Sequence, residues 1–82
     1  YSTFYAFPNP ATDVLHIGIP SAYQASSFRI RLTNMQGKEI RDYRVESRDN
    51  RLSLDISALT TGNYVVSFPD LENQVSIKFQ KN

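Results

Sequence analysis

The side chains that could support catalysis are few in this chain of 82 residues. It contains one histidine, His16, and no cysteine. Serines and aspartates are plentiful, so a Ser-His-Asp triad is arithmetically possible, but no Gly-x-Ser-x-Gly turn is present and no spacing selects one serine. A zinc site needs about three good ligands, which one histidine without cysteine does not supply. The inventory therefore predicts no catalytic residue and no bound cofactor, and it places His16 on a strand surface.

Oxygen ligands could in principle hold calcium, but their spacing gives little support for such a site. No acid falls in an Asp-x-Asp-x-Asp loop, and only Asp70 and Glu72 come close together, in a segment that reads as a hairpin tip. The three glycines are isolated, with no predicted helix after them, so no phosphate-binding loop is expected. A polar hairpin tip without a metal is the favoured interpretation.

Arginines form the remaining chemical candidate. If Arg29 and Arg31 project outward from one strand while Arg41 or Arg44 projects from its neighbour, they would form a patch able to bind phosphates or carboxylates. Acids lie among them at Glu39, Asp42, Glu46 and Asp49. Cross-strand ion pairing is therefore the favoured outcome, and an anionic glycolipid or polysaccharide is the alternative. The net charge of +1 does not favour a nucleic-acid partner.

Short apolar-polar alternations predict four strands with one buried face each, over 13–18, 27–33, 51–56 and 74–80. The side chains expected to face the core are Leu15, Ile17, Phe28, Ile30, Leu32, Leu52, Leu54, Ile56, Val75, Ile77 and Phe79. No apolar run approaches the roughly 20 residues of a transmembrane helix, and no signal peptide is apparent.

Three further segments bring the total to seven short strands. Within 38–46 the apolar residues change from an even-numbered position, Ile40, to odd-numbered ones, Tyr43 and Val45. This change predicts a bulge near Arg41 and Asp42 that restores one buried face. The nearly continuous apolar run 64–68 suits a central strand, and 4–7 suits an edge strand closed by Pro8. Hairpins are expected at 47–50 and 69–73, and a short helical or 3₁₀ turn at 57–62, with Ser57 as cap and Leu59 in the core. This spacing of strands and turns is typical of an all-β sandwich.

The segment 7–13 combines two prolines around an asparagine just before a strand. Pro8 and Pro10 lock φ and remove backbone donors, while Asn9, Thr12 and Asp13 are expected to bond to nearby backbone. We call this segment the opening turn, 34–38 with its glycine the middle turn, and 59–64 the late turn. These three turns and a basic-apolar last strand follow one another in order.

That order resembles the C-terminal sorting domain of the type IX (Por) secretion system, over nearly the whole chain from Phe7 to Lys81. The resemblance implies a non-catalytic, seven-stranded immunoglobulin-like β-sandwich with Greek-key connections. Residues 1–82 would be a single sorting domain at the end of a larger exported protein. The start at Tyr1 rather than Met fits a larger parent, and any cleavage would fall at or before the chain start.

The resemblance carries over to matching positions only. The turn residues are Pro8, Asn9, Pro10, Gly37, Leu59, Gly62 and Tyr64. The recognition residues implied for the last strand are Val75, Ile77, Lys78, Phe79 and Lys81. We expect Lys78 and Lys81 to be exposed and available for recognition, because a terminal strand can also pair by edge addition.

The implied partners are the type IX translocon and surface-attachment proteins, with anionic lipopolysaccharide and an edge-strand homodimer as further possibilities. The implied location is the periplasm in transit, then the outer membrane and cell surface or the medium. The alternative function is a carbohydrate- or lipopolysaccharide-binding immunoglobulin-like accessory module, with Tyr5, Tyr23 and Tyr43 as a sugar-stacking face.

Overall fold

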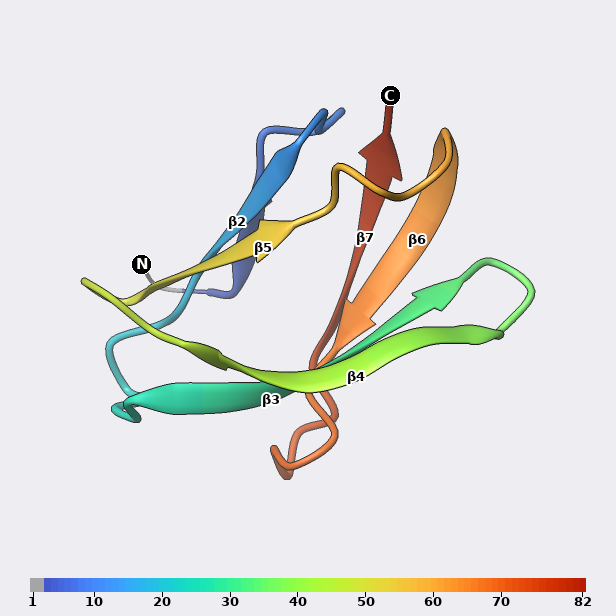
Figure 1. Ribbon diagram of the computed structural model, residues 1–82. Helices are drawn as coiled ribbons and strands as arrows, with labels where there is room; N and C mark the ends of the chain where they lie inside the picture. Colours follow the sequence, from blue (N-terminus) through green and yellow to red (C-terminus); the bar gives the residue numbers. More distant parts are fainter. Residues whose placement is uncertain (1–2) are drawn as a thin grey trace.

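The computed structural model describes residues 3–82 as two antiparallel sheets packed face to face (Figure 1). The expected processing site at or before Tyr1 lies outside the described residues. The strands are β1 (Tyr5–Phe7), β2 (Val14–Gly18), β3 (Ser27–Asn34), β4 (Glu39–Glu46), β5 (Arg51–Asp55), β6 (Gly62–Ser67) and β7 (Ser76–Lys81). The prediction of an all-β, seven-stranded sandwich is confirmed. No helix long and apolar enough to cross a membrane occurs in the described part of the chain.

The smaller sheet has the order β1-β2-β5 and the larger the order β4-β3-β6-β7. The chain passes between sheets after β2, β4 and β5, so β2 lies beside β5 and β3 beside β6, as the predicted Greek-key connections require. β1 is an edge strand and β6 a central one, as predicted. The terminal strand β7 forms one edge of the larger sheet.

The core lies between the inner faces of the two sheets and follows the alternation in the sequence. Every other residue of β2, β3 and β5 is buried, including Leu15, Ile30 and Leu54, because successive strand side chains point to opposite faces. An aromatic group closes one end of the core. There the Phe68 ring lies 4.9 Å from Phe4 and 6.1 Å from Phe28.

Three local predictions need correction. The bulge in β4 lies at Ile40, between the partners of Leu32 and Thr33, slightly before the predicted position. The turn at 47–50 is present, but the strands on either side of it belong to different sheets. The segment after β5 forms a single turn, as expected, closed by the hydrogen bond from the Leu59 N–H to the Ile56 carbonyl at 3.0 Å, but Ser57 is not its cap. Its cap is the carboxylate of Asp55, which accepts hydrogen bonds from the backbone N–H and hydroxyl of Ser57 at 3.0 and 2.7 Å.

Candidate functional site

The terminal strand β7 carries most of the predicted recognition residues, and its register decides which of them reach solvent. β7 pairs with β6 so that Tyr64 lies opposite Phe79 and Gly62 opposite Lys81. Odd-numbered side chains of β7 therefore face the core. Phe79 is buried, while Val75 and Ile77 are partly buried against the core. Lys78 lies on the outer face and is exposed, as predicted.

The prediction that Lys81 is exposed is wrong, because only 6% of its surface is exposed. It shares the parity of Ile77 and Phe79, so its side chain points inward at the end of the sandwich. Its ammonium group donates a hydrogen bond to the backbone oxygen of Asn82 at 2.9 Å. The fully buried Ala11 forms a parallel bridge with Lys81. Lys78 is therefore the exposed lysine of this strand.

The opening turn docks on the end of β7 (Figure 1). The Phe7–Pro8 and Asn9–Pro10 peptide bonds are both cis. The sequence suggested that the Asn9 side chain bonds to nearby backbone, and this prediction is wrong. Its side-chain oxygen instead accepts a hydrogen bond from the backbone N–H of Gln80, 71 residues further on, at 2.9 Å.

Backbone bonds complete this docking. The N–H of Ala11 donates to the carbonyl of Gln80 at 2.8 Å, and the N–H of Asn82 donates to the carbonyl of Ala11 at 2.8 Å. The opening turn therefore extends the larger sheet sideways, on the open edge of β7. We call these two bonds and the Asn9–Gln80 bond the latch.

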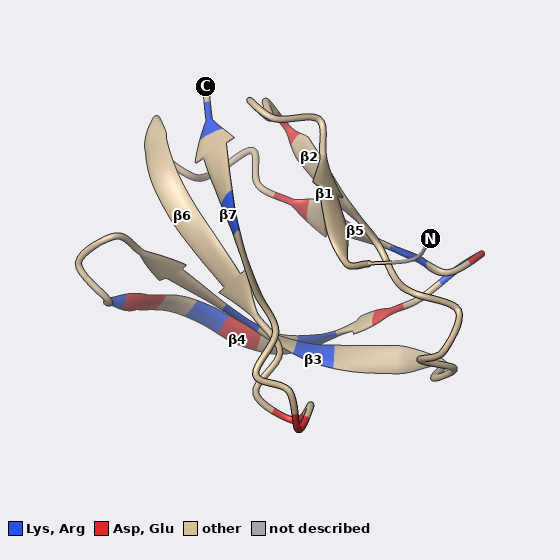
Figure 2. Cartoon of the chain, turned by 180° about the vertical axis from the view of Figure 1, so that it is seen from behind, with Lys and Arg blue, Asp and Glu red and all other residues tan. Residues whose placement is uncertain are grey.

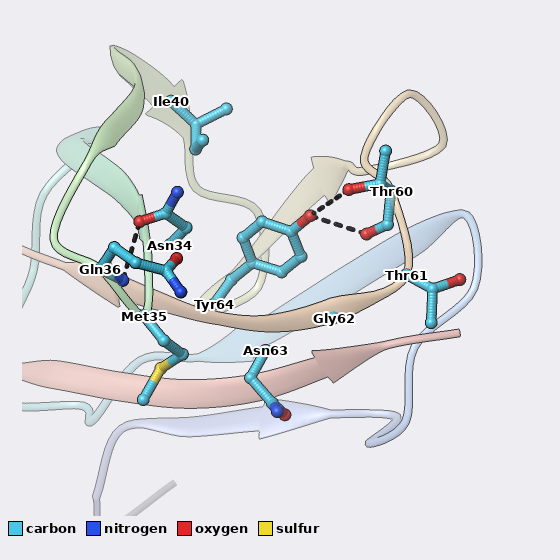
Figure 3. A pocket seen from close by; sticks show the side chains of 9 residues that line it. All are labelled: Asn34, Met35, Gln36, Ile40, Thr60, Thr61, Gly62, Asn63 and Tyr64. Carbon is cyan, nitrogen blue, oxygen red and sulfur yellow. Dashed lines mark hydrogen bonds between the residues drawn. The ribbon is translucent and has the colours of Figure 1, made fainter.

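The late turn also contacts β7, through the side chain of Tyr64. The Tyr64 hydroxyl donates to the carbonyl of Thr60 at 2.7 Å and lies 3.1 Å from the hydroxyl oxygen of the same residue (Figure 3). The Tyr64 ring stacks on Phe79, with 5.7 Å between centroids. Leu59 packs against the core, as predicted. Gly62 has a φ of 157°, a conformation that side chains rarely adopt. The late turn thus supports the terminal strand from its inner side.

The middle turn depends on Gly37, whose φ of 84° favours glycine. The side-chain oxygen of Asn34 accepts hydrogen bonds from the N–H groups of Gln36 and Lys38, at 3.0 and 2.9 Å. A hollow of about 370 Å³ lies between the middle and late turns (Figure 3). Its lining is uncharged and comprises Asn34, Met35, Gln36, Ile40, Thr60, Thr61, Gly62, Asn63 and Tyr64.

The opening turn and the late turn thus both contact β7, the last strand. The model of the family described as "Secretion system C-terminal sorting domain" matches residues 5–82. The chain belongs to this family. Comparisons with curated proteins and with solved structures found no match. The sorting domain is a non-catalytic signal of the type IX secretion system, which implies interaction with the secretion machinery and secretion or cell-surface location.

The sorting domain holds its one histidine on the smaller sheet. The Nδ1 atom of His16 lies 2.9 Å from the hydroxyl oxygen of Ser53 on the neighbouring strand. Within residues 3–82, no carboxylate forms a hydrogen bond with this ring, and no group of three or more His, Cys, Asp or Glu could hold a metal. The Ser-His contact therefore lacks the third group that would orient a catalytic base.

Arg29, Arg31 and Arg44 are ion-paired on the outer face of the larger sheet, where Figure 2 shows acids and bases interleaved. Arg41 instead donates a hydrogen bond to the backbone carbonyl of Asp55 at 3.0 Å. Arg29 donates two hydrogen bonds to Asp42, both at 2.8 Å. Asp70 pairs with Arg29 at 3.4 Å and with Arg44 at 3.6 Å, and Arg31 pairs with Glu39 at 3.1 Å. Cross-strand pairing, the favoured prediction, is confirmed.

The contact between Arg29 and Asp42 shifts the pKa of both side chains. The hydrogen bonds from Arg29 hold the pKa of the Asp42 carboxyl below its ordinary value of 3.8, and the same pairing raises the pKa of Arg29. The pKa of Asp55 is also lowered, chiefly by the Ser57 hydroxyl and then by its backbone N–H. Both carboxylates are therefore charged at neutral pH.

The three tyrosines proposed for sugar stacking lie in different parts of the sorting domain. Tyr5 lies on β1 and Tyr43 on β4, in different sheets, while Tyr23 packs its ring 4.9 Å from Phe4 in the loop after β2. Sequence reasoning missed a different aromatic contact. Tyr5 stacks on Phe7 with 5.4 Å between ring centroids. Positions two apart on one strand share a face, so the spacing of 5 and 7 could have revealed it.

Proposed function

We propose that the sorting domain forms the carboxyl-terminal part of a larger exported protein and that the secretion machinery binds it at the outer side of β7. In this proposal the domain folds in the periplasm, directs its parent across the outer membrane and delivers it to surface-attachment proteins or the medium. The supporting observation is that Lys78 alone, among the predicted recognition residues, has an exposed side chain.

The other predicted recognition residues have a different role in this proposal. Phe79 and Lys81 are buried, and Val75 and Ile77 pack against the core. They hold β7 in place so that Lys78 is presented at a fixed position. Removing the last eight residues would therefore remove part of the core as well as the contact surface, so point substitutions give the cleaner test.

The test fuses the chain to a periplasmic reporter in a host with a type IX system and measures the extracellular fraction. Lys78→Glu should lower export about tenfold, which corresponds to about 1.4 kcal/mol of binding free energy. The matched control is Lys38→Glu, which makes the same charge change at an exposed residue of the middle turn. Export of Lys78→Glu at the level of Lys38→Glu would contradict the proposal.

Anionic lipopolysaccharide is not part of this proposal. The arginines that could bind it, Arg29, Arg31 and Arg44, already face carboxylates within 3.6 Å, which reduces the positive charge they offer. The accessory sugar-binding alternative likewise lacks support, because its three tyrosines do not share a face.

A further inference from the structure

The edge of β7 is where the opening turn meets the carboxyl-terminal residues of the chain. In an antiparallel pair, alternate residues direct both backbone groups toward the partner strand. The N–H of Phe68 donates to the carbonyl of Val75 across the hairpin, so odd-numbered residues of β7 bond to β6. Even-numbered residues then direct their N–H and C=O groups away from β6. At Gln80 both of these groups are bound by the latch.

Asn9 makes its contribution to this edge without belonging to the core. It is exposed, and its side-chain oxygen takes the place that a backbone carbonyl would have in a neighbouring strand. The flanking Pro8 and Pro10 have no N–H to donate. The pairing of the opening turn with β7 therefore depends on the Asn9 side chain and on the backbone of Ala11.

From this arrangement we infer that Asn9 is a positioning residue of the export signal. This inference deepens the proposed function and rests on it. The secretion machinery binds β7 with its end held by the latch, so the signal comprises the opening turn as well as the last strand. Without the latch, Gln80 to Asn82 lose their partners on the open edge, and a strand end that frays must be ordered again when it binds.

Two substitutions at Asn9 separate the hydrogen bond from the size of the side chain. Asn9→Leu removes the acceptor and keeps the same branched arrangement of side-chain heavy atoms, whereas Asn9→Asp keeps an oxygen at the same place. The matched control for stability is Ile17→Val on β2, a fully buried position in the other sheet. This control should lower the melting temperature by about 5 °C and leave the latch intact.

The readouts are the extracellular fraction of the fused reporter, and the melting temperature and amide hydrogen exchange of the 82-residue chain. Asn9→Leu should reduce export about fivefold, the scale of one lost hydrogen bond. It should also speed exchange of the Gln80 amide about tenfold, with little change at Phe79. Asn9→Asp and Ile17→Val should export like the unchanged chain.

Each contrary result has a separate meaning. If Asn9→Leu speeds exchange at Gln80 but exports normally, the machinery does not require the latched strand and the inference is overturned. Loss of export by Asn9→Leu and Ile17→Val in proportion to melting temperature would also overturn it, because the role would then be structural only. Unchanged exchange at Gln80 in Asn9→Leu would refute the hydrogen bond itself. Failure of the proposed function is detected separately, by normal export of Lys78→Glu.

Discussion

Tyr64 connects the late turn to the terminal strand through its hydroxyl group and its ring. Its hydroxyl donates to the carbonyl of Thr60, and its ring stacks on Phe79. The contact with Thr60 is partly buried, so loss of the hydroxyl leaves a backbone acceptor without its partner. Leu59, Gly62 and Tyr64 can thus be explained by the fold before any receptor contact is invoked.

Tyr64→Phe should therefore lower the free energy of unfolding by about 1–2 kcal/mol, the cost of an unsatisfied, partly buried acceptor. Urea unfolding measures this change. The control is Tyr5→Phe on β1, where the residue is 56% exposed and the expected change is within about 0.5 kcal/mol. Equal stability of the two variants would show that the Thr60 bond contributes nothing.

At the scale of elements, the β3–β4 hairpin depends on the conformation of Gly37. Nothing lies within 4 Å of a Cβ atom placed there, so a substitution meets no steric neighbour. The whole cost comes from the φ of 84°. We expect Gly37→Ala to destabilise the domain by about 1–2 kcal/mol, and Gly37→Asn by less, because asparagine tolerates positive φ. Thermal unfolding tests this order, and an Ala variant as stable as the Asn variant would contradict it.

The elements were largely predictable from the sequence because the period-2 pattern determines which side chains share a face. The buried residues of β2, β3 and β5 follow directly from it. The predicted position of the bulge is wrong by one or two residues, because the change from an even-numbered apolar residue, Ile40, to an odd-numbered one, Tyr43, does not say which residue is the extra one.

The alternation of inner and outer side chains along β7 also places Lys81 on the inner face. Its charge suggested exposure, and no local signal indicates that Ala11 lies beside it. Nor does any local signal indicate that Asn9 reaches Gln80, since these residues are 71 positions apart. The part of the site that could not be predicted is therefore the long-range docking of the opening turn.

At the scale of the whole molecule, two carboxylates link stability to acid pH. The pKa values of Asp42 and Asp55 are lower in the folded chain than their ordinary value of 3.8. Their contributions to stability are therefore fully present above that value and are lost as the pH falls through the lower, folded values. Urea unfolding at neutral pH and at several acid values should show stability decreasing below about pH 4.

The Asp42→Asn variant tests the source of this dependence. It should be less stable than the unchanged chain at neutral pH, because Arg29 loses a charged partner. The two should converge as the pH falls, since protonation neutralises Asp42 in the unchanged chain as well. Parallel stability curves would show that Asp42 does not contribute to the acid dependence.

The stack of Tyr64 on Phe79 also gives the molecule an optical property. The chain has no tryptophan, so its near-ultraviolet circular dichroism arises from tyrosine and phenylalanine rings in asymmetric surroundings. One ring of this stack belongs to the late turn and the other to the last strand. Displacement of that strand during engagement with a carrier would therefore alter an intrinsic signal, without any attached dye.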